Sequence, residues 1–138
     1  KPAGYDYGAE YTEAQINQDL ASGTPYSIVK QKDTQGHGTH VAGSAAGRHL
    51  SVTPADTLHG GSMNSNLIIV KTTLSNSDII DGVNYIFTKA AALGKPCVIN
   101  LSVGSQYGPH DGTDLDAQTL DALTGPGKIV VRSAGNDG

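Results

Sequence analysis

The stretch "CVINLSV", residues 97–103, is a short run of mostly apolar residues rather than an alternating pattern. Two further runs have the same character, "NLIIVKT" at 66–72 and "KIVVRSAG" at 128–135. Such runs are typical of strands that are covered on both faces of a sheet. Because helical patterns separate the runs, the strands are expected to be parallel and joined by right-handed crossovers. We therefore predict an α/β fold, a parallel sheet flanked by helices on both faces.

Two helices are expected between these runs. Residues 75–94 carry an apolar stripe at helical spacing, and residues 112–123 form a shorter pattern of the same kind. Each begins beside residues that commonly cap helix N-termini. The candidate caps are Ser75 or Ser77 for the first helix and Thr113 or Asp114 for the second.

The N-terminal half is more polar and less regular. Residues 11–20 are predicted to form a short helix, because Thr12 and Gln15 have the spacing of a capping box. Residues 26–31, "YSIVKQ", are a candidate short strand, and residues 36–47 a helix of small residues. The Pro, Gly and Ser content of residues 50–65 indicates a loop.

Length and composition limit the classes of protein that fit. The 138 residues suffice for one domain with a modest core, and no apolar run approaches the roughly 18 residues of a membrane span. The net charge is −4 and the basic residues are scattered, which argues against nucleic-acid binding. Cys97 is alone, so we expect a small buried apolar residue rather than a disulfide. Since no Met opens the chain, Lys1 is expected to begin a processed or truncated piece.

The segment "GHGTH" at 36–40 places two histidines three residues apart where the small-residue helix begins. As a phosphate-binding turn it lacks the third glycine of G-x-G-x-x-G, since Val41 stands there. As a zinc site it lacks further ligands at motif spacing, because the other histidines lie in loops (His49, His59 and His110). We therefore expect neither a dinucleotide nor a metal site here.

The third interpretation is general-base catalysis. An imidazole can take a proton from a nucleophile and return it to a leaving group near neutral pH. Small neighbours such as Gly38 and Gly43 would let substrate and nucleophile approach. One base is sufficient, so His37 is the candidate and His40 is expected only to pack.

Three segments then carry a resemblance to a known family. "GHGTHVAG" at 36–43, "VINLSVG" at 98–104 and "VVRSAGNDG" at 130–138 occur in this order. Together they resemble motifs of the subtilisin-like serine proteases, or subtilases. The chain is thus expected to be a partial subtilase catalytic domain over 1–138. Residues 36–138 form its core, and residues 1–35 are a poorly matched segment or insertion.

The resemblance implies a role for particular residues. His37 would be the base of an Asp/His/Ser triad, and the side-chain amide of Asn136 would donate to the oxyanion. The backbone of residues 102–104 would pair with an extended polypeptide substrate. Residues 133–135 would line the pocket for the substrate residue before the scissile bond. The substrate-binding set is therefore Ser102, Val103, Gly104, Ser133, Ala134 and Gly135.

The chain also departs from the family pattern. The nucleophile motif G-T-S-x-A does not occur, and "DYG" at 6–8 has the letters of the acidic motif but no preceding apolar strand. We expect the acid upstream and the serine downstream, so that the piece is inactive alone while its parent is a serine endopeptidase. The alternative is a catalytically inactive pseudoprotease that acts in binding or regulation.

Other expectations are coarser. Asp33 should be a turn or cap residue, and the loop at 104–114 is expected to be longer than in the plainest members. In that loop, His110 and Asp111 would cap the next helix or touch substrate. The resemblance makes calcium binding possible, because many subtilases bind calcium, but the sequence has no oxygen-rich loop where a site could be placed. We expect an extracellular or periplasmic protein, and a fragment that self-associates through exposed strand edges.

Overall fold

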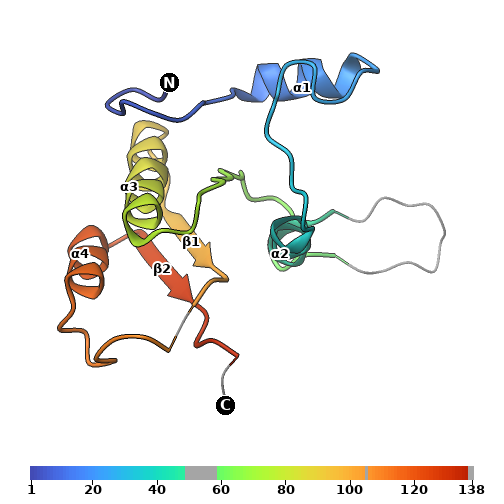
Figure 1. The fold of residues 1–138 in the computed structure, drawn as a ribbon. Coiled ribbons are helices and arrows are strands. Elements are labelled where there is room, and N and C mark those ends of the chain that lie inside the picture. Colours follow the sequence, from blue (N-terminus) through green and yellow to red (C-terminus); the bar gives the residue numbers. More distant parts are fainter. Residues whose placement is uncertain (49–58, 105, 137–138) are drawn as a thin grey trace. The chain divides into compact units, whose positions relative to one another are not determined.

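The computed structural model describes residues 1–48, 59–104 and 106–136. Within them the chain forms two compact units, Lys1–Met63 and Asn64–Gly138 (Figure 1). The first unit carries helices α1 (Glu13–Ala21) and α2 (His37–Ala46). Helix α2 therefore belongs to the same unit as the polar N-terminal segment. Most of the loop predicted at 50–65 lies outside the described residues.

Helix α1 begins with the predicted capping box. The backbone N–H of Gln15 donates to Oγ1 of Thr12 at 3.3 Å, and the backbone N–H of Thr12 donates to Oε1 of Gln15 at 2.9 Å. No carbonyl group within the helix is placed to accept from these two N–H groups, so the two side chains satisfy them instead. The prediction of a helix and its cap from the sequence is confirmed.

The strand predicted at 26–31 does not form. The backbone N–H groups of Tyr26 and Ile28 donate to the carboxylate of Asp19, at 3.1 and 2.7 Å, and the hydroxyl of Ser27 donates to it at 2.7 Å. The bonds from Ser27 and from these N–H groups lower the pKa of Asp19, whose side chain is almost fully covered. Because a side chain of α1 takes up these donors, they are not available to pair with a strand.

The second unit contains a parallel α/β arrangement. Helix α3 (Asn76–Ala92) leads to strand β1 (Cys97–Leu101), and helix α4 (Leu115–Leu123) leads to strand β2 (Lys128–Arg132). The two strands pair in parallel, with Ile99 opposite Val130. Ser75 caps α3 by accepting from the N–H of Asp78, and Asp114 caps α4 by accepting from the N–H of Ala117. The α/β class and the parallel sheet are confirmed.

The core of this unit lies between α3 and the sheet. Val83 and Phe87 of α3 are 1% and 3% exposed, and Ile99 of β1 is 4% exposed. Partly buried residues of both helices and both strands surround them, namely Ile86, Cys97, Leu101, Leu120, Leu123 and Val130. Helices α3 and α4 therefore pack on one face of the strand pair. On the other face, Val98, Ile129 and Val131 are each at least half exposed.

The strand predicted at 66–72 does not form either. In the described part of this unit the sheet has two strands, and residues 66–72 pair with neither of them. Leu67 and Ile69 are 55% and 70% exposed, so only part of the run is covered. Val70 packs against α3, where a Cβ on Gly82 would lie 3.3 Å from Cγ1 of Val70. The run packs on a helix, but it lacks the partner strand that its pattern requires.

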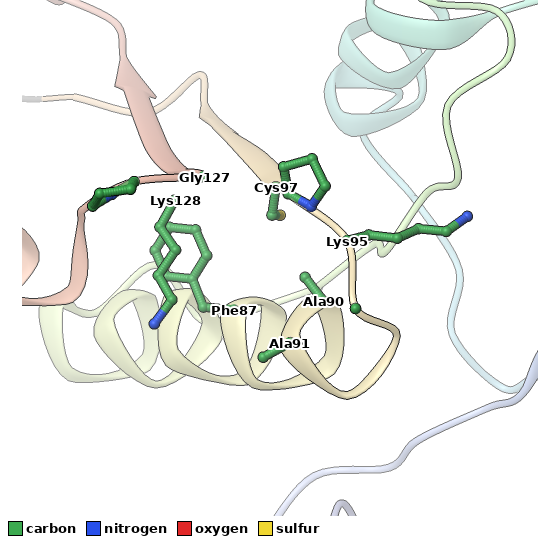
Figure 2. Close-up of a pocket in the computed structure, with 10 residues that line it drawn as sticks. Phe87, Ala90, Ala91, Lys95, Cys97, Gly127 and Lys128 are labelled. Atoms are coloured by element: carbon green, nitrogen blue, oxygen red, sulfur yellow. The ribbon is translucent and has the colours of Figure 1, made fainter.

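A hollow of about 270 Å³ opens at the amino ends of the two strands (Figure 2). The last turns of α3 form one wall, and the starts of β1 and β2 form the other. The ammonium group of Lys128 lies 5.8 Å from the ring centre of Phe87. Cys97 is half-buried in the wall, and this burial raises the pKa of its thiol. Cys97 is therefore a small apolar wall residue as the sequence predicted, but it is only half-buried rather than buried.

Candidate active site

Helix α2 begins at His37 because of the residues that precede it. Gly36 occupies the N-cap position with a φ of +82°, a left-handed value that glycine adopts without steric cost. Gly36 has no side chain to accept from the first helical N–H groups, so another residue must cap the helix. His37 is the first helical residue, and its side chain is exposed.

Asp33 supplies the missing cap. One carboxylate oxygen accepts the N–H groups of Gln35 and Gly36 at 3.0 and 2.8 Å. The other accepts the N–H and the hydroxyl of Thr39 at 2.9 and 2.8 Å. The bonds from Thr39, and then those from Gly36 and Gln35, hold the pKa of Asp33 well below its ordinary value. The predicted turn and cap role of Asp33 is confirmed, and it fixes the backbone on both sides of His37.

The far end of α2 is closed by a segment that the sequence did not single out. The N–H groups of residues 60–62 donate to the carbonyls of Gly47, Ser44 and Ala45 at 2.8, 3.1 and 2.8 Å. A Cβ on Gly60 would lie 2.5 Å from the backbone nitrogen of Gly47, so only glycine fits. The hydroxyl of Ser44 donates to the carbonyl of His40 at 3.1 Å. Ser44 thus serves the helix backbone.

The second unit brings together the two segments that the sequence assigned to substrate binding. The N–H of Ser133 donates to the carbonyl of Leu101 at 3.1 Å, which extends the pairing of β1 and β2 by one step. A Cβ on Gly104 would lie 3.2 Å from the carbonyl oxygen of Ser133. Residues 102–104 and 133–135 therefore run side by side beyond the carboxyl ends of the strands. This is the edge of a parallel sheet where ligands usually bind.

Asn136 follows this pair of segments. Its side chain is exposed, and the preceding Gly135 has a φ of +97° that favours glycine. His37 lies in the first unit and Asn136 in the second.

The loop after residue 104 contributes a side chain that the sequence analysis missed. Nε2 of Gln106 donates to the carbonyl of Ala134 at 2.9 Å. Nε2 of His110 in turn donates to the carbonyl of Gln106 at 3.0 Å. Asp111 accepts the hydroxyl and N–H of Thr113, which lower the pKa of its carboxyl. His110 and Asp111 thus shape the loop, and the helix cap that was expected of them comes from Asp114.

The comparison with known protein families identifies the family to which this chain belongs. The model of the subtilase family matches residues 5–138, which includes the histidine segment, both wall segments and most of the segment 1–35. The chain belongs to the subtilase family.

Individual relatives agree with this assignment. The subtilase chain is 35% identical over 106 residues to an extracellular serine proteinase of Thermus sp., covering 77% of this chain and 23% of that protein. It is 30% identical over 139 residues to subtilisin-like protease 5 of Arthroderma benhamiae, covering 96% of this chain and 32% of that protein. The chain therefore spans about a quarter to a third of the length of these relatives.

A solved structure shares the fold. The structure of the Clostridium perfringens CspB protease matches with a TM-score of 0.81 and 28% sequence identity. The match covers 94% of this chain and 29% of that chain. The partial subtilisin-like α/β fold is thus shown by both sequence and structure.

The hollow of Figure 2 is distinct from the candidate site of the subtilase chain. It opens at the amino ends of β1 and β2, whereas residues 102–104 and 133–136 follow their carboxyl ends. The candidate site and the hollow therefore lie at opposite ends of the two strands.

Metal ligands do not gather in the described part of this subtilase. Residues 1–48, 59–104 and 106–136 contain no group of three His, Cys, Asp or Glu side chains placed to hold a metal ion. His49 lies outside the described residues. Among the described helices, none combines the length and the hydropathy of a membrane span.

Proposed function

We propose that this chain is the part of a serine endopeptidase that supplies the catalytic base and the oxyanion donor. The observation that carries the proposal is the position of His37, exposed at the first residue of α2 and fixed by the Asp33 cap, inside a subtilase match. His37 would take the proton of a serine hydroxyl as that oxygen attacks a peptide carbonyl. It would then give the proton to the leaving amine.

Asn136 would stabilise the negative charge that develops on the carbonyl oxygen. Its amide stands on the segment after β2, at the sheet edge where the substrate would lie. In subtilisin, the loss of an asparagine donor of this type costs about 100- to 1000-fold in kcat. An Asn136→Ala change should cost a similar factor here.

The substrate would be an extended polypeptide. Residues 102–104 continue β1 beyond its last paired residue, and Ser102 and Val103 are half-buried. Such a segment can add a substrate strand through backbone hydrogen bonds. Residues 133–135 would form the opposite wall of the pocket for the residue before the scissile bond.

The triad serine and its acidic partner are proposed to lie outside these 138 residues. The chain covers only 23% and 32% of the two relatives described above, which leaves ample length for both. The chain alone should therefore have no peptidase activity by this mechanism, since a triad without its nucleophile retains little catalysis.

The test is covalent labelling of the full-length gene product with a serine-directed fluorophosphonate. His37→Ala should abolish labelling, because no other group would activate the serine. His40→Ala is the matched control, since His40 lies three residues along the same helix and is exposed there, although the sequence predicted that it would pack. Folded wild-type protein that takes up no label would contradict the proposal and would favour a pseudoprotease.

Two properties of the whole protein follow as proposals. The name of the Thermus relative, extracellular serine proteinase, supports secretion of this protein as well. Recovery of the protein only from cells, and none from the medium, would contradict secretion. The exposed sheet face and strand edges of the second unit support self-association of the 138-residue chain.

A further inference from the structure

The side chain of Gln106 reaches from the loop after β1 to the segment after β2. Its Nε2 donates to the backbone carbonyl of Ala134 at 2.9 Å. The same nitrogen lies 2.9 Å from the point where a Cβ on Gly135 would stand. The amide is therefore packed on the backbone of two residues that are proposed to line the substrate pocket.

The loop holds this amide in place from its other end. The ring of His110 donates to the carbonyl of Gln106 at 3.0 Å, and His110 itself has a left-handed φ of +55°. The loop from Gln106 to His110 is thus closed on itself, and its first member points its side chain at Ala134. A residue anchored at both backbone and side chain loses little entropy when a ligand arrives.

The two walls already lie close together without Gln106. A Cβ on Gly104 would lie 3.2 Å from the carbonyl oxygen of Ser133 and 3.5 Å from the backbone nitrogen of Gly135. The backbones of the two walls thus leave little room between them at Gly104, and the Gln106 amide occupies space beside Ala134 and Gly135. The amide also puts a polar group in that space.

Resting on the proposed function, we propose that Gln106 determines substrate specificity at the residue before the scissile bond. Its amide favours a small or uncharged polar side chain there and excludes an aromatic one. A small side chain fits the narrow space, and a hydroxyl or amide can hydrogen-bond to the glutamine. An aromatic ring would instead displace the amide from Ala134 and cover the Ala134 carbonyl without offering it a donor.

The experiment compares full-length wild type, Gln106→Ala and Gln106→Met on anilide peptides that differ only before the scissile bond, with Ala, Ser or Phe there. Wild type should cleave the Ser peptide best, because its hydroxyl can hydrogen-bond to the Gln106 amide, the Ala peptide less well and the Phe peptide least. Gln106→Ala should shift that ratio toward Phe by about 10-fold or more, as expected for space gained in a pocket. Gln106→Met keeps the length of the side chain, so it should still exclude Phe but lose the advantage of Ser over Ala.

Two controls separate the possible failures. Gln118→Ala removes a glutamine that donates to the carbonyl of Thr113 at 2.7 Å, and it should leave the ratio unchanged. Hydrolysis by His37→Ala at the wild-type rate, or none by wild type, would overturn the proposed function and this inference together. Cleavage that depends on His37, with all three peptides slowed equally in Gln106→Ala, would overturn only the role of Gln106, because a structural residue lowers every kcat/KM alike.

Discussion

Asp33 shows how one residue can fix the backbone around a proposed catalytic group, His37, without taking part in the chemistry proposed for it. Its two oxygens take four donors from residues 35, 36 and 39, which flank His37. The ionised carboxylate is the better acceptor for all four, so folding of this turn and ionisation of Asp33 support each other. The stability of this turn should therefore depend on pH.

The pH dependence has a definite sign. The folded pKa of Asp33 lies below the ordinary value near 3.9, so its stabilisation is complete above that value and is lost as the pH falls through the folded pKa. Amide hydrogen exchange at Gly36 and Thr39 should be slower in wild type than in Asp33→Ala at pH 5. The difference should disappear under strongly acidic conditions.

A matched control lies in the second unit. Asp111 makes the same kind of turn with Thr113, so Asp111→Ala should loosen Thr113 and leave the amides of Gly36 and Thr39 unchanged. Equal exchange at Gly36 in wild type and Asp33→Ala at pH 5 would show that the Asp33 bonds do not hold the turn.

Single residues also show how much of the candidate site the sequence could predict. His37, Asn136 and the wall segments stand in contiguous motifs, so they could be proposed as site residues from the letters alone. Gln106 could not, because its partner Ala134 lies 28 residues away and only the fold brings them together. Gly60 was missed for the same reason, since the backbone it approaches belongs to residues 46 and 47.

At the scale of elements, helices were predictable and strands were predictable only in part. The bonds that start a helix join neighbours in sequence, as those of Thr12, Ser75 and Asp114 do. A strand needs a partner from elsewhere in the chain. The runs at 97–103 and 128–135 supply partners for each other, whereas those at 26–31 and 66–72 pair with no strand in the described residues.

The contact of α3 with the sheet is expected to carry most of the stability of the second unit. Phe87 is 3% exposed and packs among Val83 and Ile99, so Phe87→Ala should lower the free energy of unfolding by about 3–5 kcal/mol. Urea unfolding followed by circular dichroism measures this change. Leu93 belongs to the same apolar stripe of the sequence but is 60% exposed, so Leu93→Ala should cost no more than about 0.5 kcal/mol. An equal loss in the free energy of unfolding for the two variants would show that burial of Phe87 does not stabilise the packing of α3 on the sheet.

At the scale of the whole molecule, the second unit has more apolar surface than its two helices cover. Helices α3 and α4 share one face of the strand pair, and Val98, Ile129 and Val131 lie on the other. Both strands also have an outer edge without a strand partner in the described residues. A sheet with a free face and free edges tends to pair with another copy of itself.

The 138-residue chain should therefore self-associate as its concentration rises, and the free face should drive it. Ile129 and Val131 are about half exposed, so burying them would gain about 1 kcal/mol each, or more than tenfold in the dissociation constant together. Multi-angle light scattering across a concentration series should show a mass above that of a monomer.

The double change Ile129→Lys and Val131→Lys should raise the dissociation constant by tenfold or more, because two charges would have to be buried in the contact. Leu115→Lys places a charge at a 78% exposed position on α4 and should leave the association unchanged. A monomer at every concentration would contradict the role of the free face, and equal weakening by Leu115→Lys would show that the association does not depend specifically on that face.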